Sequence, residues 1–404
     1  MGVNVNLNNR QPSGGQSLSI VWIIAGVLGI IFGGLLIGAL TPALLPVQGS
    51  AESQQVDALF RFMLVIGGAI FLLVIGVLIY AVAAFRAKPG DRADGPPIHG
   101  NTTLELVWTI IPAIIVVILT IYSYQVWISI RTIQPLNHDV EVVGQRFAWT
   151  FNYDITPETL PADISAAQLD ETVLASLNSD EGLQFSHPQL HTWVGEQVEL
   201  KMRTEDVNHA FWIPDMRIKQ DLLSGRETSI TFTPIKAGVY RIVCAELCGA
   251  GHGNMAGTSA EIDGEVDLRG AWLVVHEDEQ TYLREFYEPE AQKALFPPED
   301  PVERGRQLLA SGSYPCGTCH ILTDLNWNGN IGPNLNNIGT RAASRVGGQT
   351  AEQYLQNSIR NPGAYLVPGF GNLMTQFNDE SGEPNYMPEE DLSAIIAYLL
   401  TQTQ

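Results

Sequence analysis

A loop near the middle of the chain is dense in metal-binding residue types. Cys244 and Cys248 are four positions apart, and His252 and Met255 follow them. Two thiolates, an imidazole and a thioether form a soft donor set, which selects copper, zinc or iron–sulfur clusters, and the thioether favours copper. A structural zinc site and a pair of buried core cysteines are the alternatives. We therefore predict a copper centre in this loop.

A second metal-binding motif lies downstream, at Cys316-Gly-Thr-Cys319-His320. Cys-x-x-Cys-His is the attachment sequence of c-type haem, in which the cysteines form two thioethers and the histidine binds iron. A thioredoxin-like redox pair is the alternative, but it leaves the histidine unexplained. The chain contains four cysteines, so the two motifs use all of them and leave none for a disulfide. Because bacteria attach haem outside the cytoplasm, we expect this region there.

Three apolar runs precede both motifs, at about residues 18–40, 60–85 and 104–127. Each is long enough to cross about 30 Å of hydrocarbon as a helix. We therefore expect residues 1–136 to form a membrane region with three helices. The first run could instead be a secretory signal cleaved near residues 49–51, but its length favours a retained helix.

Charged residues indicate the orientation of these helices in the membrane and the net charge of the remaining surface. Arg86, Lys88 and Arg92 lie between the second and third runs, whereas residues 41–59 contain no Lys or Arg. The positive-inside rule then places the loop of Arg86 in the cytoplasm and everything after the third run outside a bacterial inner membrane. Of the chain's 22 Lys and Arg and 43 Asp and Glu, 16 Lys and Arg and 38 Asp and Glu follow residue 136, so the whole acidic excess lies there. Such a surface repels nucleic acid and attracts a basic partner.

The remaining sequence divides into three parts. Residues 137–279 alternate apolar and polar positions between turn signals, which predicts a β-sandwich or barrel. Within it, residues 154–190 are polar and acidic and predict a loop with one short helix. Residues 280–301 predict a charged linker, and residues 302–404 predict a helical domain with long loops around the haem motif. The expected strands are 139–143, 147–153, 197–203, 229–233 and 239–244.

His209 belongs with the copper loop on topological grounds. It follows a predicted strand and lies 35 residues before Cys244. In a sandwich, a ligand at a strand end can join a ligand-rich loop at the same end, so we predict His209 as a further copper ligand. The other histidines match no motif, and we expect them on the surface or in loops: His99, His138, His187, His191 and His276.

Together these features resemble subunit II of the haem–copper cytochrome c oxidases, in the form with a fused C-terminal class I cytochrome c domain. The spacing Cys-x-Glu-x-Cys-x3-His-x2-Met is shared chiefly with nitrous oxide reductase and some nitric oxide reductases. The resemblance implies membrane helices, then a cupredoxin-like sandwich, then an all-α cytochrome c domain. It also implies a binuclear copper centre, CuA, bridged by two thiolates, with the ligands His209, Cys244, the Glu246 carbonyl, Cys248, His252 and Met255.

For the haem, the resemblance implies attachment to Cys316 and Cys319, with His320 as one axial ligand. A low-spin electron-transfer haem commonly takes a methionine as the second. Only Met374 and Met387 follow the motif. Residues 367–374 resemble the loop that delivers this ligand in class I cytochromes, whereas Met387 directly precedes the acidic start of the last helix. We predict Met374, although Thr375 follows it where the family usually has proline.

The resemblance also implies roles for three further positions. The Glu246 side chain would contribute to a magnesium site shared with subunit I. Glu105, at the start of the third apolar run, would mark the entrance of a proton-uptake path, and ionisable groups at a membrane boundary are functional suspects in their own right. Phe147 occupies the position at which the family usually has the tryptophan that accepts electrons from soluble cytochrome c. That departure favours delivery by the tethered haem domain.

The function implied by the resemblance is electron input to a proton-translocating cytochrome c oxidase. An external cytochrome c or copper protein would reduce the haem, and electrons would then pass through CuA to haem in subunit I, where oxygen becomes water. The expected partners are subunits I and III, the donor and the lipid bilayer. A CuA-containing subunit of a nitric oxide or nitrous oxide reductase is the alternative.

Overall fold

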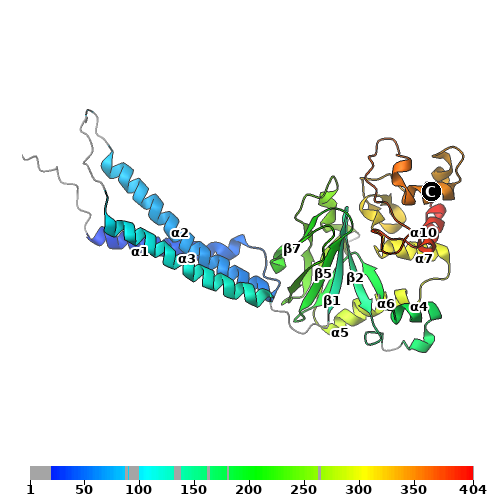
Figure 1. The fold of residues 1–404 in the computed structure, drawn as a ribbon, viewed down its shortest axis with the longest axis horizontal. Coiled ribbons are helices and arrows are strands. Elements are labelled where there is room, and N and C mark those ends of the chain that lie inside the picture. The colour runs from blue at the N-terminus through cyan, green and yellow to red at the C-terminus, as the bar shows by residue number, and fades with distance from the viewer. Residues whose placement is uncertain are drawn as a thin grey trace, which may run out of the picture. The chain divides into compact units, whose positions relative to one another are not determined.

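The computed structural model divides the chain into two compact units, which are described separately (Figure 1). One contains Met1–Pro46 and Gln55–Ser129, and the other contains Val47–Gln54 and Ile130–Gln404. Lys88 and Arg92, which support the predicted orientation, and His99 lie outside the described residues. The structure describes residues 20–86, 90, 100–131, 138–161, 164–179, 182–262 and 265–403.

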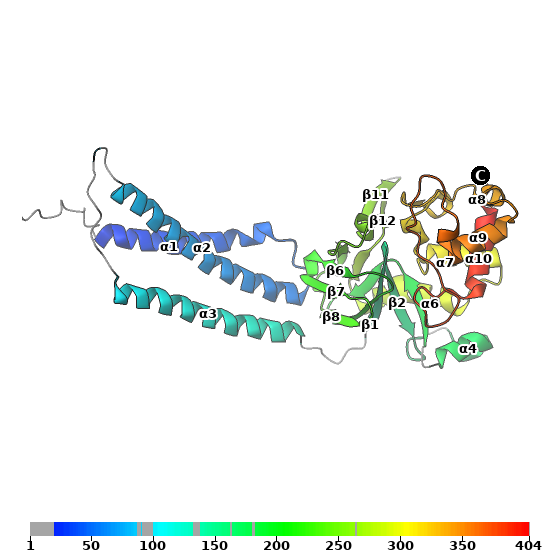
Figure 2. The ribbon, with the colours of Figure 1, turned by 45° about the horizontal axis from the view of Figure 1, so that its top comes forward.

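The first unit is made of apolar helices long enough to cross a membrane (Figure 2). They are α1 (Ile20–Leu40), α2 (Ala51–Phe85) and α3 (Thr102–Arg131). Small residues let α1 approach α2 closely, since a Cβ atom on Gly34 would lie 2.8 Å from the Val65 carbonyl oxygen. The rings of Phe62 and Tyr122 join α2 to α3 edge to face, with centroids 5.5 Å apart. The three predicted membrane helices are confirmed.

The second unit is built on a β-sandwich, as the alternating pattern predicts. Its largest sheet has the order β3-β2-β1-β5-β8, in which β1 pairs antiparallel with β2 and parallel with β5. Alternate side chains point inward, so Val140, Val142, Phe151 and Leu200 are fully buried. The strands are β1 (Asp139–Gln145), β2 (Ala148–Ile155), β3 (Leu183–His187), β5 (Val198–Thr204) and β8 (Thr228–Phe232).

Two three-stranded sheets and a hairpin complete the sandwich. The sheets have the orders β10-β6-β7 and β4-β13-β9, and β11 pairs with β12. The bounds are β4 (Leu190–Trp193), β6 (His209–Ile213), β7 (Ile218–Leu222), β9 (Gly238–Arg241), β10 (Val243–Cys244), β11 (Thr258–Ile262), β12 (Glu265–Arg269) and β13 (Trp272–His276).

The acidic stretch 154–190 differs from its prediction. It contains the expected short helix, α4 (Glu171–Leu177), whose N-cap is Asp170. It also contains β3, an edge strand that pairs antiparallel with β2. In β3 the apolar Leu183 and Phe185 alternate with Gln184 and Ser186, and Phe185 is the one buried residue of the strand. This pattern is too short to stand out from the polar stretch around it.

The predicted linker is largely folded onto the sandwich. It forms α5 (Glu279–Tyr282), a π-helical turn η5 (Leu283–Tyr287) and α6 (Glu288–Leu295). Tyr282, Phe286 and Leu295 lie in the same buried cluster as the sandwich core. Residues 279–295 therefore pack as part of the sandwich and leave only a short connection to the next helix.

The C-terminal residues form a helical region with its own core. Its helices are α7 (Pro301–Ala310), α8 (Ile338–Arg341), α9 (Ala351–Arg360) and α10 (Glu389–Thr401). Thr350 and Gln353 form a capping box at the start of α9. Helices α7 and α10 cross so closely at Gly305 that a Cβ atom there would clash with the Ala394 carbonyl.

Contrary to expectation, His191 is buried, and His138, His187 and His276 are half-buried. His191 stacks on Phe286, with ring centroids 3.7 Å apart, and its Nδ1 lies 3.0 Å from Nε2 of His276. His138 contacts the rings of Trp193 and Tyr282. These side chains fill the space between the sandwich and the folded linker.

We predict that this cluster makes the sandwich acid-sensitive. Burial lowers the pKa of His138 from 6.5 to about 4, so the unfolded chain binds its proton more readily. Stability should therefore fall as pH falls from about 6.5 to about 4, by about 3 kcal/mol from this residue. Urea unfolding across this range should show the loss, and His138→Phe should reduce it. An equal pH dependence in the variant would contradict the prediction.

Candidate metal centre

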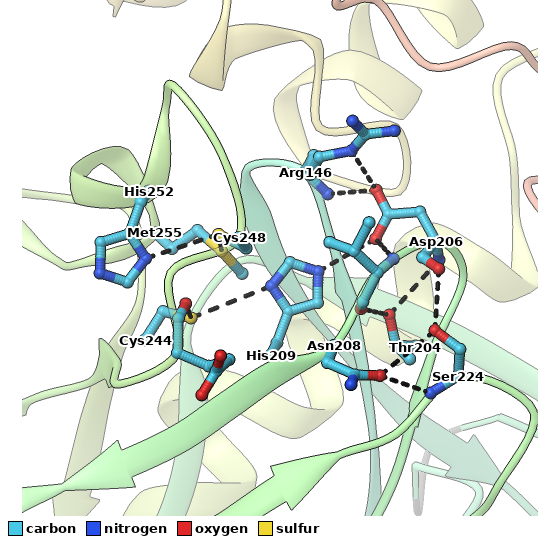
Figure 3. A network of polar contacts seen from close by, with 12 residues as sticks. Arg146, Thr204, Asp206, Asn208, His209, Ser224, Cys244, Cys248, His252 and Met255 are labelled. Atoms are coloured by element: carbon cyan, nitrogen blue, oxygen red, sulfur yellow. Dashed lines mark hydrogen bonds and ion pairs between the residues drawn. The ribbon is translucent and has the colours of Figure 1, made fainter.

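Strand pairing brings the predicted copper ligands together at one end of the sandwich (Figure 3). β6 begins at His209 and pairs antiparallel with β10, which ends at Cys244. The loop after β10 then turns into a short 3-10 helix, η4 (His252–Met255), which supplies the last ligands. Two segments distant in the sequence therefore contribute to one site.

The six predicted donor groups form a continuous chain of close contacts. Cys244 Sγ lies 3.9 Å from His209 Nδ1 and 3.2 Å from the Glu246 carbonyl oxygen. Cys248 Sγ lies 3.5 Å from His252 Nδ1 and 3.4 Å from Met255 Sδ. Ligand atoms of His209 and the two cysteines all lie within 4.8 Å of one another.

The centre is shielded from water. His209, Cys244, Cys248 and Met255 are all buried, with at most 7% of the surface of any of them exposed. Trp149 is also buried, and its ring packs edge to face on His209 with centroids 5.8 Å apart. A soft donor set in a dry pocket fits copper and offers nothing to a hard, strongly hydrated cation.

A carboxylate fixes the orientation of His209, as Figure 3 shows. Asp206 Oδ1 lies 3.0 Å from His209 Nε2, so Nδ1 of the same ring faces Cys244. Arg146 donates to Asp206 through its backbone N–H at 2.8 Å and its guanidinium Nε at 3.1 Å. Partners of this kind hold a metal-binding imidazole in one tautomer. Asp206 lies three residues before His209, and this Asp-x-x-His spacing is the sequence signal that could have revealed its role. We did not predict that role.

The protonation of these groups reflects the same contacts. Burial opposes ionisation of Asp206, yet its hydrogen bonds to His209 and Arg146 lower its pKa to about 2. Burial also opposes ionisation of Cys244, but the contact with His209 and backbone hydrogen bonds lower its pKa overall. Burial and the neighbouring Cys244 raise the pKa of Cys248 to about 12. A cation is the natural partner that would let both thiolates ionise together.

Comparison with known proteins identifies the family. Residues 39–126 match the transmembrane domain of cytochrome c oxidase subunit II, and residues 139–260 match its periplasmic domain. A cytochrome c oxidase subunit 2 from Synechocystis is 34% identical over 284 residues, which cover 63% of this chain and 82% of the relative. The chain belongs to the cytochrome c oxidase subunit II family.

Two further subunit II proteins extend the comparison. The one from Thermostichus vulcanus is 34% identical over 238 residues, covering 52% of this chain and 72% of its own. The one from Alkalihalophilus pseudofirmus is 26% identical over 342 residues, covering 83% of this chain and 84% of its own.

Family membership establishes the general role of the protein. It is a subunit of a cytochrome c oxidase, an oxidoreductase complex of the bacterial membrane, and its sandwich domain is extracytoplasmic. Subunit II carries copper in a CuA centre through which electrons enter the oxidase. The cluster of His209, Cys244 and Cys248 fits that centre.

The haem motif of this subunit II also has a defined geometry. His320 is buried, and its Nδ1 lies 2.6 Å from the Pro333 carbonyl oxygen. Nδ1 therefore donates, which leaves Nε2 of the neutral ring to bind a metal. A Cβ atom on Gly332 would lie 2.7 Å from the His320 ring, so only glycine fits beside it. Cys316 and Cys319 occupy the turn directly before this histidine.

The two candidate methionine ligands lie in different surroundings. Met387 is 1% exposed, lies within the helical core and directly precedes the N-cap of α10. Met374 is half-buried on a long loop without regular structure and packs against the same core. The loop can deliver a side chain to a cofactor without disturbing the helices, whereas Met387 already serves as core packing.

The remaining predicted positions are placed as follows. Glu246 is exposed beside the copper loop. Glu105 lies in the first turn of α3, where its side chain accepts a hydrogen bond from the Asn101 N–H at 3.3 Å. Phe147 is 1% exposed and lies beneath the copper loop at Gly249 and Gly251.

We predict that Asp206 is needed for full copper affinity. Asp206→Asn removes the carboxylate that orients His209, and loss of such a partner typically weakens metal binding about 10–100-fold. Copper titration of metal-depleted protein would measure the change. Asp221→Asn is the control, because Asp221 is an exposed residue paired with Lys219. Equal affinity in the Asp206 variant and the wild type would contradict the prediction.

Proposed function

We propose that this subunit receives electrons from an external donor on a covalent haem and passes them through binuclear copper to subunit I. The observation that carries the proposal is the chain of six close donor groups around the buried Cys244 and Cys248. The copper-loop spacing is shared with some nitrogen-oxide reductases, but the matches of residues 39–126 and 139–260 to the two domains of cytochrome c oxidase subunit II favour an oxidase.

In the proposed copper centre each residue has a distinct task. Cys244 and Cys248 would bridge two coppers, and His209 and His252 would each bind one. Met255 and the Glu246 carbonyl would complete the two coordination spheres. A copper pair bridged in this way shares a single electron between two metals. The protein's own contribution is to keep the ligands dry and oriented, which the burial of His209 and its bond to Asp206 support.

The proposed haem rests on residues 302–404. Cys316 and Cys319 would form the thioethers, and His320 and Met374 would bind the iron. The bond from His320 to Pro333 and the space beside Gly332 support this role. An acidic surface would guide a basic cytochrome or copper protein to this region.

Further proposals concern the partner subunits. Glu246 is exposed and would be available to a magnesium ion shared with subunit I. Glu105 would mark the start of a proton path at the membrane boundary. Subunit III and the lipid bilayer complete the proposed surroundings. The domain limits we propose remain 1–136, 137–279, 280–301 and 302–404, with the third segment packed on the second.

Metal analysis of the purified complex tests the proposal. We expect two coppers and one covalent haem in this subunit beside the metals of subunit I, with a mixed-valence copper spectrum. Intact-mass measurement of the subunit would detect the haem directly. Zinc in the copper loop, or a single copper with a blue-copper spectrum, would contradict the assignment.

The axial methionine can be tested separately. Met374→Ala should remove the near-infrared Met-to-iron band and lower the haem potential, because a thioether ligand raises it. Met387→Ala should leave the band in place, although loss of a buried methionine should cost about 2–5 kcal/mol of stability. Loss of the band in the Met387 variant alone would reverse the assignment.

A further inference from the structure

The haem-binding segment contacts the copper loop directly. Asn254 Nδ2 donates to the Thr318 carbonyl oxygen at 3.2 Å. Beside this bond, the Ile331 side chain lies against Gly251 and Phe147. Cys319 also packs against the buried cluster of the sandwich. Both segments belong to the same compact unit of the chain.

The positions of these two residues give the hydrogen bond its significance. Asn254 lies in η4 between His252 and Met255, both proposed copper ligands. Thr318 directly precedes Cys319, one of the proposed attachment points of the haem. A continuous path therefore runs from Met255 along the backbone to Asn254, across one hydrogen bond, and along the backbone of Thr318 to the next residue.

We infer that the Asn254–Thr318 hydrogen bond is the contact through which electrons cross from the haem-binding segment to the copper loop. The inference rests on the proposed function, because it requires both cofactors. In the step, one electron leaves haem iron, which changes from Fe(II) to Fe(III), and the copper pair gains that electron. No bond between atoms of the protein forms or breaks, and no proton moves. Asn254 acts as a positioning residue.

The contact between the two segments is uncharged, whereas docking of a basic donor depends on charge. An amide, a carbonyl and apolar side chains meet there, and none of them carries a charge. Phe147 is buried under the loop, so an external donor cannot reach it directly. Salt screens interactions between exposed charges, so the internal step should not depend on ionic strength, whereas reduction by a basic donor should.

The structure offers a matched control at a second contact between the same regions. The backbone N–H of Asn385 donates to Glu205 Oε2 at 3.1 Å. Glu205→Ala removes this bond, which touches neither metal-binding segment. Asn254→Leu removes the first bond and keeps the branching of the side chain. Ile331→Ala loosens the contact at the copper loop without changing any residue of that loop.

The decisive experiment follows copper reduction after rapid reduction of the haem in the full oxidase complex. Asn254→Leu should slow this step, because the two segments would then face each other without the hydrogen bond that joins them. Ile331→Ala should also slow it, and Glu205→Ala should not. The rates should be equal at low and high salt, and the spectra and potentials of both centres should match the wild type.

A second readout does not depend on electron transfer. In copper-depleted protein, Asn254→Leu should increase amide hydrogen exchange in peptides covering residues 316–332, because the contact no longer holds that segment. An unchanged transfer rate in Asn254→Leu with both centres intact would overturn the inference. Equal slowing by Glu205→Ala would also overturn it, because the bond would then be one docking contact among several. Lack of haem or copper in the unmodified protein would instead overturn the proposed function.

Discussion

The pairing of β6 with β10 is the constraint on which the copper site depends. The register places Cys244 opposite Phe211, and the Ala245 N–H continues it by donating to the Ala210 carbonyl at 2.8 Å. A slip of one residue would turn every side chain of a strand to the opposite face. His209 at the start of β6 would then no longer face the cysteine, and the six donor groups would not converge. The convergence of the soft ligands at one site therefore depends on β-sheet hydrogen bonding.

Local sequence patterns were sufficient to predict much of this molecule. Three long apolar runs indicated membrane helices, and period-two alternation identified β1, β2, β5 and β8. The spacing of Cys244, Cys248, His252 and Met255 fixed the copper loop, because these residues lie within one short turn. In each case the information lay within a few neighbouring residues, so no knowledge of tertiary structure was needed.

The features that escaped prediction depend on contacts between distant residues. The charged composition of residues 280–301 indicated a linker, but Tyr282 and Phe286 find a buried site on the sandwich that composition cannot reveal. His138 and His191 match no motif because packing against aromatic rings, rather than a metal, determines their place. The role of Asp206 required knowing which ring nitrogen of His209 faced the cysteine.

The folded linker has a consequence for how the two redox regions find each other. Because residues 279–295 are held in the sandwich core, only residues 296–300 separate that core from α7. Pro297 and Pro298 stiffen this short connection, since proline-rich segments behave as semi-rigid spacers. A short flexible tether would already give the haem-binding segment an effective concentration in about the millimolar range. A stiff tether of this length restricts the search further, so the proposed haem would serve the copper site of its own chain and dilution of the oxidase would leave the exchange unaffected.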